Sequence, residues 1–337
     1  MRLSAFGDVL LTVPAVRTLQ ASFPDAKITW IISPGAYPIL EGLSGIDFLI
    51  VDKPRDLRTY VAAYKKLKPY KFDILLCMQA SFSANILFPL IKAKRRIGFD
   101  NARARDAHRL FVREAVSAGR DHLLDAFMRF PEALGCKEKK YTWDLNIPQS
   151  DRDWLAKHWA KDLFLEKKTF VVNPSCSKPE RNWLKERYVQ VIQKVKERWD
   201  VNILLTGGPG ESERKLAAYI QAEVGFPIVN WVGKTTPKQL AVVLEKADVL
   251  LAPDTGPLHL AGAMGTPVVG LYAVASSALS GPYFSKDFIV DKFPEAVRTF
   301  LKKDPNKVPW KTRVHTQKAM TLITVDEVLE KLAKIFN

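Results

Sequence analysis

The chain has 337 residues, which is more than one ordinary hydrophobic core accommodates and fits two domains. Hydrophobic residues make up 47% and charged residues 26%, a globular balance that excludes a disordered chain and a coiled coil. The 51 Lys and Arg exceed the 36 Asp and Glu, giving a net charge of +15. Such an excess favours anionic partners, namely phosphorylated molecules, nucleic acid or an acidic membrane surface.

The cysteines and the apolar segments indicate the compartment. Cys77, Cys136 and Cys176 are too few and too widely spaced for a disulfide framework or a CxxC metal site, and they fit a reducing cytoplasm. No apolar run reaches the roughly 18 residues that cross a bilayer, and the first residues lack the pattern of a secretory signal. We therefore expect a cytoplasmic protein that can still touch a membrane surface.

Apolar periodicity predicts alternating helices and strands in the first half of the chain. In chain order these are a helix over 9–23, strands over 27–32 and 48–51, a helix over 59–67, a strand over 72–78, a helix over 83–91, a strand over 96–99 and a helix over 121–134. Only Met1, Arg2 and Leu3 precede the turn into the first helix, so the first strand is expected to be truncated.

A charged and polar linker is predicted around residues 141–165, with its own helix over 151–161. The alternation then restarts with strand 169–173, helix 184–198, strand 202–206, helix 211–222, strand 228–230, helix 237–246, strand 249–252, helix 257–264, strand 267–272 and helix 326–336. This pattern is typical of α/β proteins with parallel sheets. We expect two doubly wound domains, 1–150 and 151–337, with a ligand cleft between them.

The most informative motif lies at residues 252–267, where a predicted strand leads into a helix. Asp254 and Thr255 are residue types that cap helices, and Gly256 lets the backbone approach a ligand closely. The N–H groups of Thr255 and Gly256, with the helix dipole behind them, suit a diphosphate. His259 in the first turn could face the same ligand. The alternative is an ordinary capped turn in which His259 packs against its neighbours.

Two other loops follow strands of the same predicted sheet. Ser175 offers a hydroxyl group, and Lys178 and Arg181 offer cations to a phosphate, although a solvated basic loop is the alternative. Glu211 follows a glycine-rich turn and can accept hydrogen bonds from ribose hydroxyls, or it can simply complement the helix dipole. The glycine spacing is not GxGxxG, so it gives a dinucleotide site no direct support.

In the first half, Asp8 is either a plain N-cap or a carboxylate that takes a proton from an acceptor hydroxyl. Residues 92–120 hold nine cations and three acids. The arginines assigned to an anionic acceptor are Arg95, Arg96, Arg103, Arg105, Arg109 and Arg120. A solvated charged face is the alternative. Nucleic acid is not expected as a partner, because no nucleic-acid motif or aromatic ladder accompanies the cluster.

Three segments together resemble the glycosyltransferase family 9 heptosyltransferases of lipopolysaccharide synthesis, the heptosyltransferase I-like members above all. They are Phe-Gly-Asp-Val-Leu at 6–10, Arg-Asn-Trp at 181–183 and Asp-Thr-Gly-Pro-Leu-His-Leu-Ala at 254–261, and the resemblance covers nearly the whole chain. It implies a GT-B fold of two Rossmann-like domains, with the acceptor on the first and the nucleotide-sugar on the second. It further implies an inverting, metal-independent transfer of heptose from ADP-heptose to the Kdo-bearing lipid A core.

The resemblance also implies roles for single residues. Asp8 matches the general base, and Arg181 stands where the family usually has a lysine. The remaining matches to the donor site are Ser175, Glu211, Thr235 near the adenine, Asp254, Thr255, Gly256 and His259. Residues 273–277 depart from the family's usual Gly-Pro-Thr loop, which bears on donor specificity. The last helix is expected to pack back on the N-terminal domain.

The expected setting is a cytoplasmic monomer, peripheral on the inner face of the cytoplasmic membrane of a Gram-negative bacterium, with no cofactor and no metal. Three alternatives stay open: a family member with another sugar or core acceptor, a nucleotide-sugar-binding protein of the same fold with little catalysis, and a sugar-nucleotide epimerase. An epimerase would convert a nucleotide-sugar with no acceptor present. Loss of transfer in Asp8→Ala, with donor binding retained, would support an enzyme that uses Asp8.

Overall fold

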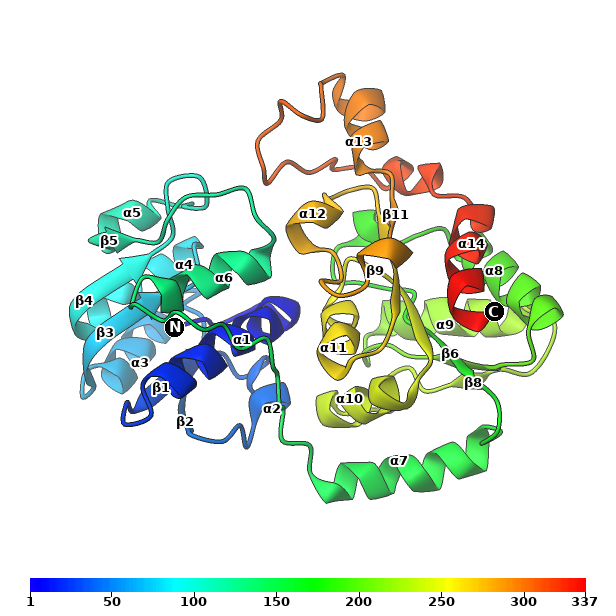
Figure 1. Ribbon diagram of the computed structural model, residues 1–337, viewed down its shortest axis with the longest axis horizontal. Coiled ribbons are helices and arrows are strands. Elements are labelled where there is room, and N and C mark those ends of the chain that lie inside the picture. Colours follow the sequence, from blue (N-terminus) through cyan, green and yellow to red (C-terminus); the bar gives the residue numbers. More distant parts are fainter. The chain divides into compact units, whose positions relative to one another are not determined.

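The computed structural model describes all 337 residues, which form two compact units, Met1–Asn146 and Ile147–Asn337 (Figure 1). Both units contain parallel sheets, as the alternation of helices and strands predicts. None of the helices combines the length and the apolar character that crossing a bilayer requires.

The strands of the first unit form two parallel groups joined by the start of the chain. They are β1 (Ile28–Ile32) beside β2 (Ile46–Ile50), and β3 (Lys71–Cys77), β4 (Lys92–Gly98) and β5 (Glu114–Ala115) in that order. The N–H of Arg2 donates to the carbonyl of Ile31, and the N–H of Met78 donates to the carbonyl of Met1. Residues 1–3 therefore occupy the place of a short strand between β1 and β3.

Helices cover this sheet from two sides. They are α1 (Phe6–Ser22), α2 (Tyr37–Leu40), α3 (Leu57–Leu67), α4 (Phe82–Asn85), α5 (His108–Phe111) and α6 (Leu123–Glu132). α1 packs against α6. Ala63 and Leu67 of α3, Ala84 of α4 and Val112 after α5 belong to one buried cluster, so α3, α4 and α5 cover the same face.

The expected helix over residues 83–91 is wrong. α4 ends at Asn85, and a separate 3₁₀ turn spans Phe88–Leu90. Pro89 explains the break, because it lacks the N–H group that a continuous helix would need. The elements α2, α5 and β5 were not predicted from the sequence, because segments of two to four residues are too short to show a periodicity.

The second unit is a six-stranded parallel sheet in the order β11-β10-β9-β6-β7-β8. The strands are β6 (Thr169–Val172), β7 (Asn202–Leu205), β8 (Val229–Asn230), β9 (Val249–Pro253), β10 (Val268–Tyr272) and β11 (Val290–Asp291). Read from β8, this is the 3-2-1-4-5-6 order of the nucleotide-binding Rossmann fold. In such a sheet, ligands bind at the carboxyl ends of the strands, where the strand order reverses between β6 and β9.

The helices of the second unit are α7 (Gln149–Asp162), α8 (Lys185–Arg198), α9 (Glu211–Glu223), α10 (Pro237–Lys246), α11 (Gly256–Met264), α12 (Ser277–Ser280), α13 (Phe293–Ala296) and α14 (Val325–Phe336). α11 begins one residue earlier than expected and ends where expected, because Gly265 adopts the left-handed φ of 84° that terminates helices. α14, expected to pack on the N-terminal domain, makes contacts with α8, β10 and β11 of its own unit.

Candidate active site

Asp8 lies at the carboxyl edge of the first sheet, because α1 starts directly after the short pairing segment at residues 1–3. It is the third residue of the helix, and Ala5 occupies the N-cap position, so Asp8 is not the N-cap itself but helps to cap the helix start from the third position. The Asp8 carboxylate forms an ion pair with the guanidinium of Arg2 and accepts the N–H of Ala5 at 3.4 Å. Its side chain is 32% exposed, which leaves it within reach of a bound molecule.

Arg2 is a residue of this site that the sequence reasoning missed. Its side chain is 9% exposed, its Nη1 donates to the carbonyl of Met78 at 2.8 Å, and the guanidinium lies 5.2 Å from the ring centre of Phe127. Burial lowers the pKa of Arg2, while the charge of Asp8 opposes that shift. A guanidinium held on several sides fixes the orientation of the carboxylate it contacts. The signal that could have identified Arg2 is its charge, because it stands between the apolar residues Met1 and Leu3 in a segment that pairs like a strand.

Asp254 lies at the carboxyl edge of the sheet in the second unit, because it directly follows β9. Its Oδ2 lies 2.8 Å from Nη1 of Arg181 and 3.9 Å from Nη1 of Arg313, and its side chain is 9% exposed. Burial raises the pKa of Tyr272 well above its usual value, and the nearby charge of Asp254 adds to that rise. Two cations therefore converge on one buried carboxylate at the switch point of the sheet.

Arg313 was also missed, because residues 302–316 show no periodic pattern and no element was expected there. The structure attaches this segment to the sheet: Ala275 and Arg313 form an antiparallel bridge, and the N–H of Val314 donates to the carbonyl of Val274 at 2.9 Å. A contact of this kind joins residues far apart in the chain, which local sequence reasoning does not detect.

The N-terminus of α11 lies beside this cluster. Thr255 is the N-cap residue and makes no capping hydrogen bond with its side chain. The N–H groups of Gly256 and Leu258 belong to the first helical turn and have no acceptor inside the helix, while Pro257 has no N–H. These donors and the positive helix end favour an anion. His259, the fourth helical residue, is buried.

Glu213, and not Glu211, faces the neighbouring loops. Its Oε1 accepts the N–H of Gly208 at 3.2 Å and lies 3.5 Å from Oγ of Ser175. Glu211 points away and pairs with Lys215 one turn along α9 at 2.6 Å, and both side chains are exposed. The different orientations of the two side chains follow from their positions in α9. The side chain of the third helical residue reaches back over the helix N-terminus, whereas that of the first residue does not.

Two further donor candidates lie at the margins of this edge. Lys178 is exposed, and its carbonyl accepts the thiol of Cys176 at 3.1 Å. Thr235 is half-buried and precedes α10 by two residues. No group of three or more His, Cys, Asp or Glu side chains in the chain is placed to hold a metal ion.

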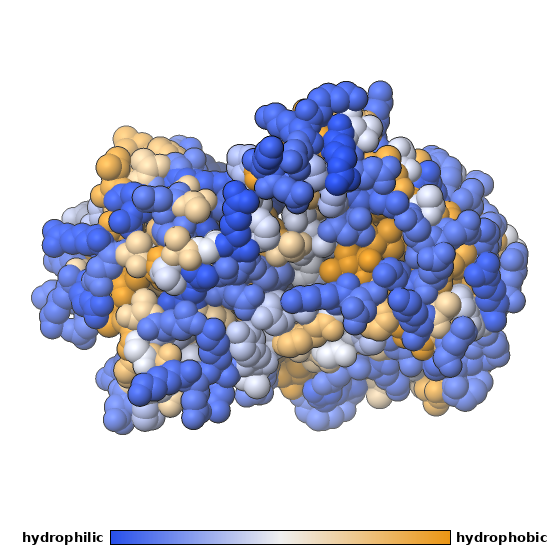
Figure 2. Space-filling model, turned by 45° about the horizontal axis from the view of Figure 1, so that its top comes forward, coloured by the Kyte–Doolittle hydropathy of each residue, from blue (hydrophilic) through white to orange (hydrophobic).

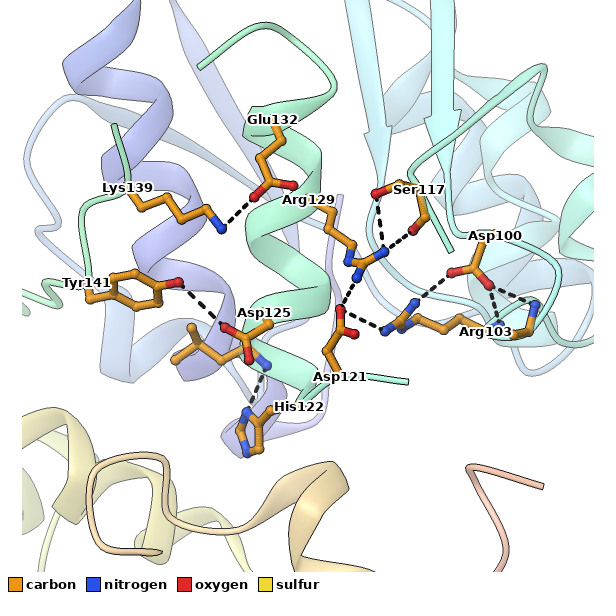
Figure 3. A network of polar contacts seen from close by, with 12 residues as sticks. Asp100, Arg103, Ser117, Asp121, His122, Asp125, Arg129, Glu132, Lys139 and Tyr141 are labelled. Atoms are coloured by element: carbon orange, nitrogen blue, oxygen red, sulfur yellow. Dashed lines mark hydrogen bonds and ion pairs between the residues drawn. The ribbon is translucent and has the colours of Figure 1, made fainter. Parts of the chain in front are cut away.

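The six arginines assigned to an acceptor do not form one surface. Arg103 is buried and contacts Asp100 at 2.8 Å and Asp121 at 3.4 Å, within the network that joins Asp121 to Arg129 (Figure 3). Arg95 forms two hydrogen bonds with Glu114, and Arg96 donates to the carbonyl of Ile91. Arg95 is exposed but paired with Glu114, whereas Arg105, Arg109 and Arg120 are exposed with no carboxylate within ion-pair distance. Sequence spacing grouped these cations, but strand β4 and the loop after it separate them.

Known proteins resemble this chain over its full length. The model of "Glycosyltransferase family 9 (heptosyltransferase)" matches residues 60–308. The lipopolysaccharide core heptosyltransferase OpsX of Haemophilus influenzae is 33% identical over 99% of this chain and 95% of its own length. A family 9 glycosyltransferase of Veillonella parvula superposes with a TM-score of 0.79 at 19% identity, covering 99% of this chain and 95% of that one.

The E. coli heptosyltransferase WaaC, solved with ADP, superposes with a TM-score of 0.72 at 19% identity, covering 99% of both chains. At this identity the solved structures establish the fold, which is the expected GT-B-like α/β architecture. The matches also confirm the resemblance that the motifs at residues 6–10, 181–183 and 254–261 carry.

Proposed function

Because this chain belongs to glycosyltransferase family 9, the heptosyltransferases, we propose that it transfers heptose from ADP-heptose to the Kdo-bearing lipid A core of lipopolysaccharide. The relatives support both substrates: OpsX is a lipopolysaccharide core heptosyltransferase, and WaaC has been solved with ADP and with ADP-2-deoxy-2-fluoro heptose. The transfer inverts the anomeric centre and uses no metal ion.

The donor diphosphate binds at the carboxyl edge of the second unit. The N–H groups at Thr255 and Gly256, the positive end of α11 and the cations of Lys178 and Arg181 stabilise the negative charge of the departing ADP. Asp254 holds Arg181 in place, which supports this role. Together these cationic and dipolar groups supply the charge that a metal ion provides in other transferases.

The nucleoside part of the donor lies on the adjacent loops. Ser175, in the loop after β6, lies beside Glu213, which contacts the turn after β7, and Glu213 takes the ribose role that the sequence suggested for Glu211. Thr235 lies near the adenine, and His259, in the first turn of α11, contacts the donor. A carboxylate that accepts two ribose hydroxyls favours a nucleoside diphosphate over free diphosphate.

Asp8 acts as the general base. It takes the proton of an acceptor hydroxyl while that oxygen forms a bond to the anomeric carbon and the carbon–oxygen bond to ADP breaks. A single displacement from the opposite face inverts the configuration. The carboxylate of Asp8, partly exposed and held by the buried guanidinium of Arg2, is the observation that carries this assignment. Arg2 is a positioning residue in this scheme.

The acceptor is anionic and lipid-linked. The exposed Arg105, Arg109 and Arg120 follow β4 and β5 on the same unit as Asp8 and suit phosphate and carboxylate groups. The net charge of +15 favours electrostatic attraction of the protein to the anionic inner leaflet of the cytoplasmic membrane, where the acceptor lies.

A donor screen with a deacylated Kdo-lipid A acceptor, read by ADP release, tests this function. We expect turnover with ADP-heptose in the presence of excess chelator, and an inverted anomeric configuration in the product by NMR. Turnover with another ADP-sugar alone would favour a different family 9 activity. Binding of ADP without turnover of any donor would favour a nucleotide-sugar-binding protein, and loss of activity on chelation would contradict metal independence.

A further inference from the structure

Three large apolar side chains stand in solvent at the ends of neighbouring helices in the first unit. Leu57 is 78% exposed, Phe82 67% and Leu110 83%. Leu57 and Phe82 are the first residues of α3 and α4, and Leu110 is the third residue of α5. Each helix follows a parallel strand, so all three side chains lie near the carboxyl edge of the sheet, the edge that carries Asp8.

α3 extends this apolar surface along its length. Leu57, Val61 and Tyr64 recur at positions i, i+4 and i+7, so they share one side of the helix. Val61 and Tyr64 are each 39% exposed. A helix of a folded domain usually buries such a stripe, but α3 buries Ala63 and Leu67 against the sheet instead. The stripe therefore faces outward.

Cations accompany these apolar residues. Residues 55–71 contain six Lys and Arg and the single acid Asp56, whose carboxylate is engaged by the N–H of Thr59 at the start of α3. The ammonium group of Lys68 lies 5.7 Å from the ring centre of Tyr64. The surface is thus basic and apolar together, which is the composition of helices that lie on anionic lipid.

The same mixture occurs around α4 and α5. Arg105 and Arg109 are exposed there, and the neighbouring acid Asp106 accepts the N–H of Phe82 at 2.9 Å. This hydrogen bond ties the loop after β4 to α4, so Phe82 and the α5 segment belong to one surface. Apolar areas among hydrophilic ones are visible on the first unit, at the left of Figure 2.

We propose that the outer side of the α3–α4–α5 layer, defined by Leu57, Val61, Tyr64, Phe82 and Leu110, docks on an anionic phospholipid bilayer. Charge selects this occupant over a second copy of the chain, because two lysine-rich surfaces repel each other and lysine is depleted at protein interfaces. The inference rests on the proposed function for its setting: a lipid-linked acceptor must reach the Asp8 edge, and this surface borders that edge.

Co-sedimentation of the full chain with vesicles tests the docking surface without any substrate. We expect binding to phosphatidylglycerol–phosphatidylethanolamine vesicles, little binding to phosphatidylcholine, and weaker binding at high salt. The triple variant Leu57→Ser/Phe82→Ser/Leu110→Ser is expected to bind on the order of tenfold more weakly. The matched control is Phe164→Ser/Leu165→Ser, which removes two side chains of the second unit that are 62% and 64% exposed; it is expected to bind like the wild type.

A second variant tests the charge separately. Lys65→Gln/Lys66→Gln is expected to weaken binding to anionic vesicles several-fold and to reduce its salt dependence. Both variants alter exposed side chains, and circular dichroism and thermal unfolding confirm that each retains its fold.

Three results would overturn the inference. The first is binding of the triple variant to vesicles as strongly as the wild type, and the second is an equal loss of binding in the control variant. The third is unchanged vesicle binding by the triple variant with a changed sedimentation coefficient in the absence of vesicles, which would point to self-association through this surface. Turnover of the deacylated acceptor is expected to survive in the triple variant. A wild-type chain that binds vesicles but transfers no sugar would remove the proposed function and leave the docking surface in place.

Discussion

Each unit places an aspartate–arginine pair where a helix begins at the carboxyl edge of its sheet, and the two pairs differ in exposure. Asp8 is the third residue of α1, contacts Arg2 and is 32% exposed. Asp254 immediately precedes the N-cap of α11, contacts Arg181 and is 9% exposed. The residue types are the same, but the Asp8 side chain is the more exposed of the two.

The difference teaches that position relative to the helix start decides what an acidic residue can do. Asp8 lies within the first turn and its carboxylate is partly exposed, as the proposed general base requires. Asp254 lies before the helix, buried against Arg181 and near Arg313, so it holds these two cations beside the start of α11, where we propose that the donor diphosphate binds. Under the proposed function, the first pair serves proton transfer and the second serves charge stabilisation.

Removing the exposed carboxylate should have the largest effect. Asp8→Asn keeps the shape but cannot take a proton, so kcat is expected to fall by roughly 10² to 10⁴-fold. ADP release measures kcat, and calorimetry with ADP-heptose should find donor affinity within about twofold of the wild type, because Asp8 lies in the other unit. A variant that keeps more than a tenth of the activity would show that Asp8 is not the base.

Removing the buried carboxylate should change stability instead. Asp254→Ala leaves the partly buried guanidinium of Arg181 without its carboxylate, which is expected to lower the free energy of unfolding of the second unit by about 3 kcal/mol. Denaturant unfolding measures this loss, with Asp8→Asn, expected to change stability by less than about 1 kcal/mol, as the reference. Equal losses in the two variants would contradict the contrast between the pairs.

A smaller effect separates the two acids of α9. Glu213→Gln is expected to raise the KM for ADP-heptose about tenfold, because an amide is a weaker acceptor than a carboxylate for hydroxyl groups. Glu211→Gln, its control on the same helix turn, should leave KM unchanged, since Glu211 pairs with Lys215 in solvent. Initial rates over a range of donor concentrations measure both; the reverse result would restore the sequence-based assignment.

The smallest expected effect concerns the cysteines. Burial raises the pKa of Cys77 to about 12, so its thiol should resist alkylation at pH 8 until the protein unfolds. Burial also raises the pKa of Cys176, but this residue is partly exposed beside the donor loops. Its labelling should therefore rise with pH above 8, as the thiolate fraction grows, and ADP should slow it several-fold. Mass spectrometry after timed alkylation measures this, and indifference to ADP would argue against a donor site at this edge.

The sequence predicted the helices and strands of the second unit more completely than those of the first. The helix that begins at Gly256 and ends before Gly265 was predictable from caps and glycine, because those signals act within a few residues. The helix expected over 83–91 failed at Pro89, where a local breaker outweighed an apolar pattern. Elements of four residues, such as α5, are too short to show an apolar periodicity.

The sequence by itself determined the parallel α/β class, the strand–helix alternation, the family, and the positions of Asp8 and Asp254 at helix starts, because periodicity and capping are local. The tertiary structure decided which charges meet: Arg2 with Asp8, Arg313 near Asp254, Glu213 and not Glu211 against the glycine loop, and Arg103 inside a network and not on a surface. It also decided that the stripe of α3 faces solvent. These outcomes depend on how separate segments pack, and a charge or an apolar side chain acquires its role from the neighbours that packing brings to it.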